Sequence, residues 1–163
     1  MSHATRTTTH QLVVDAPAEL VFSLLSAASH WPDLDGVTVY AEQISGDERE
    51  NEVRISFAVD GALMSTHFRR LIDAEERSIR FQHSGPDTTP YQVSGSWHVD
   101  LATDGPTPGP PASVVTLEHE YLIEEGSEEA WAEEIFDEYA RRELAALRRS
   151  CERLQLLQRH FGK

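Results

Sequence analysis

Alternation of apolar and polar side chains over long stretches is the feature that most constrains how this chain can fold. Apolar side chains recur at nearly every second position from Val53 to Val59, from Tyr91 to Leu101 and from Val115 to Ile123. Successive side chains of a β-strand point to opposite faces, so each stretch predicts a strand with one buried face. β-Branched residues from Thr7 to Val14 predict a further strand. Short turns between such segments, as at Gly61, favour an antiparallel sheet of about seven strands.

The first strand is followed by a segment with helical periodicity. Asp15 as an N-cap and Pro17 in the first turn are typical signals for the start of a helix. The apolar residues behind them share one face over about ten residues, namely Leu20, Val21, Leu24 and Leu25. A short second helix or tight turn is expected at His30–Leu34.

A second helical segment follows the strands and determines the fold class. It begins at Ser127, extends for about thirty residues and ends before Gly162. Several strands followed by one long helix predict an α+β fold, in which the apolar face of the helix lies against a curved sheet. A strongly bent sheet around a helix is expected to leave an internal cavity suited to apolar ligands. We expect a single domain over residues 1–163, with flexible ends at 1–6 and 160–163.

The charge balance excludes several classes of protein. The 163 residues include 28 acidic and 14 basic side chains, for a formal net charge of -14. A nucleic-acid binder needs a positive surface, so no nucleic acid is expected as a partner. No run approaches the roughly 20 apolar residues of a membrane span, and the polar N-terminus does not resemble a signal peptide. With Cys151 as the only cysteine, these features predict a cytoplasmic protein without disulfides.

Common catalytic motifs are also missing from the sequence. The only lysine is Lys163, so Schiff-base chemistry is not expected. No histidine lies at metal-ligand spacing from His119, and no HExxH, GxGxxG, P-loop or GxSxG motif occurs. The sequence therefore predicts neither a bound metal nor a nucleotide cofactor nor a hydrolase triad.

Three ionisable side chains interrupt the predicted inward-facing stripes. Arg70 shares its strand face with Phe68, His119 shares its face with Leu117, and Glu143 falls on the apolar stripe of the long helix. Burying a charged group alone costs several kcal/mol. We therefore expect the three groups to lie near one another, and near water or ligand. An arginine, a histidine and a glutamate in one cavity form an acid–base set.

Each of these residues also has a structural interpretation. A histidine on an apolar stripe is commonly a hydrogen-bonded core or rim residue. An arginine near the end of a strand can extend to solvent, and the helix around Glu143 is crowded with charges. The large aromatic side chains of Trp31, Phe57 and Trp97 are expected in the core or in the cavity wall.

Several segments of the chain resemble a known superfamily. APAELVF, from Ala16, and WPDL, from Trp31, are similar to the start of the START-like, birch-pollen-allergen-like helix-grip domains. The later segments FRRLIDAEERSIRF, SGSW, TLEHEY and ARRELAALRRSCER resemble the aromatase/cyclase family of bacterial type II polyketide synthases. Together they cover the chain from Thr8 to about Arg153. On this resemblance, the α+β fold would be a curved sheet around a long C-terminal helix.

The resemblance implies a reaction and roles for the three residues. The enzyme would take a poly-β-ketone from the acyl carrier protein of a polyketide synthase, close a ring by aldol condensation and dehydrate it to an aromatic ring, without a cofactor. Arg70 would stabilise the enolate and His119 would move protons. Glu143, where many members carry aspartate, would orient His119 or a water, or donate a proton. The expected substrate contacts are Trp31, Tyr40, Phe57, Phe68, Tyr91, Trp97 and Tyr121.

Other interpretations remain open at this point. A non-catalytic carrier of the same fold would use Arg70 and His119 only to bind a lipid, quinone or polyketide. A stress-response or co-chaperone relative would bind peptides, which gives no reason for an inward arginine and histidine. The oligomeric state is left open by the sequence, and a homodimer is one of the alternatives. Four arginines of the long helix either dock the acyl carrier protein or belong to a solvated helix face: Arg141, Arg142, Arg148 and Arg149.

Overall fold

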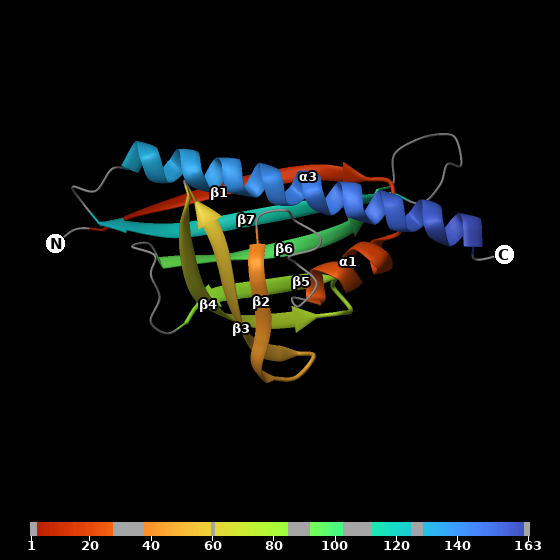
Figure 1. Ribbon diagram of the computed structural model, residues 1–163, viewed down its shortest axis with the longest axis horizontal. Coiled ribbons are helices and arrows are strands. Elements are labelled where there is room, and N and C mark those ends of the chain that lie inside the picture. Colours follow the sequence, from red (N-terminus) through yellow and green to blue (C-terminus); the bar gives the residue numbers. More distant parts are fainter. Residues whose placement is uncertain are drawn as a thin grey trace.

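The computed structural model describes residues 3–27, 38–59, 61–84, 92–102, 112–124 and 129–161. Figure 1 shows one sheet with the longer helix lying along it. In chain order the elements are β1 (His3–Val14), α1 (Ala18–Ser26), β2 (Thr38–Gly46), β3 (Glu50–Val59), β4 (Ala62–Asp73), β5 (Ser78–His83), β6 (Gln92–Leu101), β7 (Ser113–Glu124) and α3 (Glu129–Phe161).

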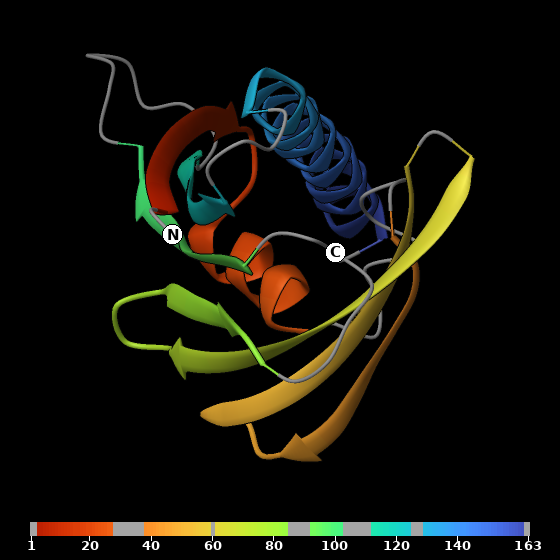
Figure 2. The ribbon, with the colours of Figure 1, turned by 90° about the vertical axis from the view of Figure 1, so that its left-hand side faces the viewer.

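The seven strands form one antiparallel sheet in the order β1-β7-β6-β5-β4-β3-β2. Strands adjacent in sequence pair with each other from β2 to β7, and β1 closes the order by pairing with β7. Figure 2 shows that the sheet curls, with β2, β3 and β4 turned round the side on which both helices lie. The predicted antiparallel sheet is confirmed.

The start of α1 differs from the sequence expectation. Pro17 occupies the N-cap position with an extended backbone (φ -63°, ψ 147°), and no side chain caps the helix. The carbonyl of Pro17 accepts the first helical hydrogen bond, from the backbone N–H of Val21 (3.1 Å). The prediction that Asp15 is the cap is wrong, because the N-cap lies two residues later, at Pro17. The backbone N–H of Asp15 donates to Oε2 of Glu152 in α3 (3.0 Å).

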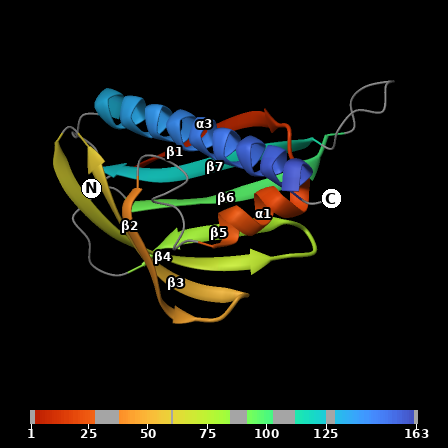
Figure 3. The same cartoon turned by 45° about the vertical axis from the view of Figure 1, so that its right-hand side comes forward.

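The long helix α3 contacts β1, β7 and α1. Figure 3 shows α1 beside the C-terminal part of α3, with both helices on the same side of the sheet. Four of the five buried hydrophobic residues described in α3 recur at spacings of three or four, so that one stripe faces the sheet, and Ala146 is buried beside it. The length of 33 residues confirms the predicted long helix. The main stripe consists of Ala140, Leu144, Leu147 and Cys151.

The apolar side chains divide into two clusters. The larger joins the inner faces of β5, β6 and β7 to α1 and α3, and includes Ile79, Trp97 and Leu117. The smaller lies on β2 and β3, where Phe68 of β4 packs against it. Of the buried polar residues on the inner face, His119 lies on β7, beside the larger cluster, and Arg70 lies on β4, beside the smaller one.

The predicted α+β helix-grip architecture is confirmed, whereas the internal cavity and the single-domain extent stay predictions. The short helix expected at His30–Leu34 lies outside the described residues. Residues 3–6 belong to β1 and residues 160–161 to α3, and the expected flexibility of the two ends stays a prediction. None of the helices in the described part of the chain is long and apolar enough to span a bilayer.

Candidate active site

One row of residues crosses the inner face of the sheet from β1 to β3. The backbone register places each next to the following one on the neighbouring strand, in the order Thr8, His119, Gly95, Phe81, Arg70 and Asn51. As the alternation predicts, Arg70 and His119 are buried, with 1% and 9% of their surface exposed. They lie towards opposite ends of the row, with Gly95 and Phe81 between them.

Arg70 is held by acceptors of the protein itself. Its Nε donates to Oδ1 of Asn51 (3.0 Å), Nη1 donates to the carbonyl of Leu25 (3.3 Å), and Nη2 donates to the carbonyl of Ser26 (2.7 Å). Leu25 and Ser26 are the last two residues of α1, so the guanidinium also meets the negative end of the helix dipole. Arg70 therefore fastens the end of α1 to β4 and β3.

The electrostatic state of Arg70 follows from its burial. Removal from water disfavours the charged form and lowers the pKa of Arg70 to about 10. The group is still cationic at neutral pH. The inner face of the sheet thus carries one fixed positive charge at this end of the row.

His119 occupies the part of the row next to β1. Its ring makes an edge-on contact with Phe81, with 5.8 Å between the ring centroids. A Cβ at Gly95 would lie 2.7 Å from Cζ of Phe81 and would collide with the carbonyl oxygen of Glu118. Glycine at this position therefore makes room for Phe81 beside His119. Burial, and to a smaller extent the charge of His10, lower the pKa of His119 to about 4, so its imidazole is neutral at pH 7.

Glu143 lies on α3 at the margin of the buried stripe. It is half-buried, three residues after Ala140 and four before Leu147. This agrees with the sequence-based placement on the helix face. Its proposed action on His119 stays a prediction.

Three of the aromatic residues expected around the substrate lie on the inner face. Trp97 belongs to the main core cluster. Tyr121 is buried two positions beyond His119 on β7. Phe68 is half-buried and packs edge-on against Phe81, with 5.5 Å between the ring centroids. Edge-on ring contacts thus run from Phe68 through Phe81 to His119, while Trp97 belongs to the core.

Tyr40 does not lie on this face, which corrects the sequence-based assignment. A register shift of β2 between Thr38 and Tyr40 places Tyr40 on the outside, where 43% of its surface is exposed. Its hydroxyl donates to Glu42, and Arg54 lies over its ring (5.6 Å to the centroid). Trp31 and Tyr91 lie outside the described residues, and only the backbone of Phe57, in β3, is described.

The arginines expected as a docking patch are exposed on α3. Arg141 pairs with Asp137, Arg142 with Glu138 and Arg148 with Glu152, each one turn away on the same helix. These pairs put charges of both signs on this surface, as in a solvated helix face.

Sequence analysis overlooked a second histidine on the inner face. Nε2 of His10 in β1 lies 2.7 Å from Oδ1 of Asp137 in α3. Oδ2 of the same carboxylate lies 3.0 Å from Nε of Arg141. The side chain of His10 is 14% exposed, and its Nδ1 is buried without a hydrogen-bond partner among the described residues. The available signal was alternation with Leu12 and Val14, which point to the same face.

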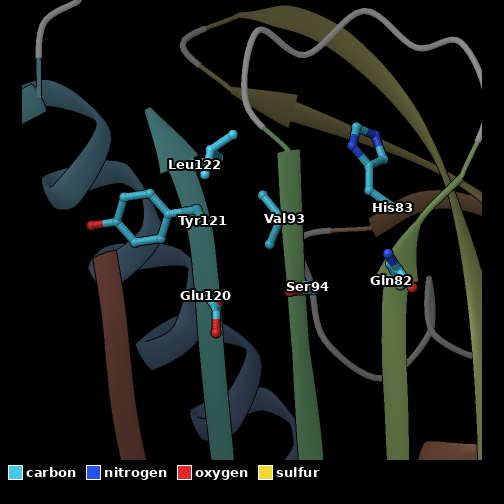
Figure 4. Close-up of a pocket in the computed structure, with 7 residues that line it drawn as sticks. All are labelled: Gln82, His83, Val93, Ser94, Glu120, Tyr121 and Leu122. Carbon is cyan, nitrogen blue, oxygen red and sulfur yellow. The ribbon is translucent and has the colours of Figure 1, made fainter. Parts of the chain in front are cut away.

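The described residues also form a small pocket. It lies where β5 ends and β6 begins, beside β7, and has a volume of about 150 Å³. Ligand sites commonly have volumes of roughly 300–1,000 Å³, so this pocket alone does not define a substrate site. Figure 4 shows its lining residues, Gln82, His83, Val93, Ser94, Glu120, Tyr121 and Leu122.

Within the described ranges, no group of three or more histidine, cysteine or acidic side chains is arranged to hold a metal ion. The ionisable groups on the inner face of the described sheet include the imidazoles of His10 and His119 and the guanidinium of Arg70, with the carboxylates of Asp137 and Glu143 on α3. Such groups move protons and stabilise oxyanions.

Comparison with known proteins shows that this chain is similar to a class of enzymes. No family model matches the chain. Over 142 residues the chain is 29% identical to the granaticin polyketide synthase bifunctional cyclase/dehydratase of Streptomyces violaceoruber. The aligned region covers 85% of this chain and 41% of that protein. The chain thus spans less than half the length of this curated relative.

Solved structures share the fold of this chain. The Zhui aromatase/cyclase of a Streptomyces species superposes with a TM-score of 0.80 at 20% identity, covering 92% of this chain and 95% of that one. The di-domain ARO/CYC BexL gives a TM-score of 0.71 at 28% identity, over 88% of this chain and 45% of that one. A START superfamily protein of Mycobacterium smegmatis gives 0.76 at 14% identity, over 94% and 99%. The resemblance to polyketide aromatase/cyclases and to the START-like fold is confirmed.

Proposed function

We propose that this chain catalyses ring closure and dehydration of a poly-β-ketone delivered by an acyl carrier protein. The observation that carries the proposal is a buried, neutral imidazole on the inner face of a sheet whose fold is shared with aromatase/cyclases. A buried guanidinium on the same face supports it. Because the curated relative is more than twice as long, the proposal concerns the reaction of this domain.

The reaction suits a site with few polar groups. The methylene between two ketones is already acidic, so a base of modest strength removes its proton if the enolate is stabilised. Restricting the chain to one folded conformer supplies much of the remaining acceleration. Phe68, Phe81 and Tyr121 provide rigid surfaces for this restriction.

The two ends of the row contribute differently to this chemistry. Arg70 contributes a fixed positive charge that favours the enolate and alkoxide oxygens. His119 contributes a neutral ring with one donor and one acceptor nitrogen. Glu143 orients His119 or a water molecule from α3.

Reconstitution with a minimal polyketide synthase tests the proposal. Adding this protein should replace the mixture of spontaneously cyclised products by one ring pattern. His119→Gln should weaken this change. His98→Gln, which alters an exposed histidine on β6 paired with Asp100 (2.8 Å), is the matched control and should behave as wild type.

An unchanged mixture of spontaneous products would contradict the enzymatic function. If the protein then still bound the polyketide, as measured by quenching of its tryptophan fluorescence, a carrier of the same fold would be the better conclusion.

A further inference from the structure

We propose that His10, held by Asp137, is a second acid–base group of this interior and accepts the proton that is removed during ring closure. The inference rests on the proposed function and deepens it, since neither the resemblance nor the spacing of residues assigns a role to His10. It follows from the hydrogen bond that His10 makes, from its position on the sheet and from the groups around it.

The hydrogen bond determines which nitrogen of His10 carries a proton. The pKa of Asp137 is lowered, chiefly by its hydrogen bond with His10, so the carboxylate is ionised and can only accept. Nε2 of His10 must therefore be the donor. In the neutral ring Nδ1 then holds the lone pair, and this atom is the one buried without a partner among the described residues.

The position of His10 directs it to the same interior as His119. His10 pairs with Leu117, and Thr8 pairs with His119, so the two histidines are diagonal neighbours on adjacent strands. Such neighbours lie roughly 7–8 Å apart and are within reach of each other's side chains. The pKa of His119 is lowered partly by the charge of His10, which is consistent with this proximity.

The groups around His10 differ from those around His119. The groups around His10 are Thr8 on its own strand, His119 on β7, and Asp137 with Arg141 on α3. Asp137 lies directly on the ring of His10 and holds it in one tautomer and orientation, as the aspartate does in catalytic His–Asp pairs. Burial instead keeps His119 neutral, with a pKa of about 4, and a group this acidic is a weak base at pH 7.

The proposed step balances its protons and electrons within the substrate and His10. The methylene C–H bond breaks, its proton moves to Nδ1, and its electron pair remains as an enolate. The enolate carbon then forms a C–C bond with a ketone carbon of the same chain, whose oxygen becomes an alkoxide. Nδ1 returns the proton to this oxygen, so His10 ends the cycle neutral.

The product assay of the reconstituted synthase tests the role of His10. His10→Gln should lower the rate of directed cyclisation by about 100-fold or more, the usual contribution of a general base. Asp137→Asn should lower it less, because the ring of His10 loses the charged acceptor that fixes its tautomer. His98→Gln and Asp100→Asn alter the histidine–aspartate pair of β6 and should not change this rate.

A second measurement examines the pair without any substrate. Nitrogen-15 NMR of the histidine rings should show His10 with protonated Nε2 and unprotonated Nδ1 above its titration range. A proton on Nδ1 would overturn the proposal. Thermal unfolding of each variant checks its fold, and Asp137→Asn keeps the test available if His10→Gln does not fold.

The outcomes separate this inference from the proposed function. A wild-type protein that directs cyclisation, with a His10→Gln variant of equal rate and equal pH profile, would overturn the inference alone. A wild-type protein that leaves the product mixture unchanged would overturn the proposed function and the role of His10 with it.

Discussion

The two ends of the cross-strand row handle buried polar groups in opposite ways. At the β3–β4 end, Arg70 donates to Asn51 and to two carbonyls at the end of α1, and Asn51 donates in turn to the carbonyl of Asp47 (3.0 Å). At the β1–β7 end, the hydroxyl of Thr8 and Nδ1 of His10 are buried without partners among the described residues.

This difference indicates that one end of the row stabilises the fold and that the other is available for a reaction. A buried polar group that is fully hydrogen-bonded stabilises one arrangement of the chain, whereas a buried group without a partner costs stability and calls for an explanation such as a ligand. The paired end therefore anchors α1 and supplies a fixed charge. The end at Thr8, His10 and His119 is where we expect a substrate to exchange protons.

The largest effect should follow from removing Arg70. Arg70→Met leaves the carbonyls of Leu25 and Ser26 without their donor, and should lower the free energy of unfolding by about 3–5 kcal/mol. Arg69→Met, one residue earlier on the exposed face of β4, should cost less than about 1 kcal/mol. Urea unfolding measures both. Equal losses would show that Arg70 does not anchor α1.

Acidification should reveal the buried imidazole of His119 at the other end. Its folded-state pKa of about 4 lies below the ordinary value of 6.5, so between these values the unfolded chain binds a proton that the folded chain does not. Stability is therefore lost as the pH falls from 6.5 to 4, by about 3 kcal/mol from this group.

His119→Gln removes this contribution. The decrease in the free energy of unfolding between pH 7 and pH 4 should be smaller in His119→Gln than in wild type. His98→Gln, on the exposed side of β6, should retain the wild-type decrease. Equal pH dependence of wild type and His119→Gln would place His119 in contact with solvent.

The sequence predicted which side chains of the row face inward, but not the hydrogen bonds that these side chains make. Period-two alternation sufficed to place Arg70 and His119 on the inner face, because burial of one face is a local property of each strand. Two of the three acceptors of Arg70 lie 44 and 45 residues away in α1. Such partners depend on how a helix docks on the sheet, which no local pattern contains.

The two misplaced residues have local causes. Tyr40 points outward because a register shift in β2 reverses the alternation that the sequence suggested. His10 was overlooked because Thr8 is its other neighbour on the inner face, so the apolar alternation of Leu12 and Val14 does not continue past it. Its partner Asp137, 127 residues later, became visible only with the fold.

A smaller effect is expected at the middle of the row. Gly95→Ala forces a methyl group against the carbonyl oxygen of Glu118 and the ring of Phe81, and overpacking of this kind costs about 1–3 kcal/mol. Ser94→Ala, the preceding residue on the other face of β6, should be nearly neutral. Adding Phe81→Leu to Gly95→Ala should restore only part of the loss, because the carbonyl stays in place. Thermal unfolding of the three variants checks this order, and a neutral Gly95→Ala would contradict the close approach.

The smallest change compares the two ends most directly. Thr8→Val preserves shape and removes a buried hydroxyl that has no partner among the described residues, so stability should change by less than about 1 kcal/mol, and can rise. Asn51→Leu, at the opposite end, removes the acceptor of Arg70 and a donor to Asp47, and should cost at least about 2 kcal/mol. Urea unfolding of both variants measures the contrast. A loss at Thr8 as large as that at Asn51 would mean that the hydroxyl is already bonded in the folded protein, and the two ends of the row would then be equally structural.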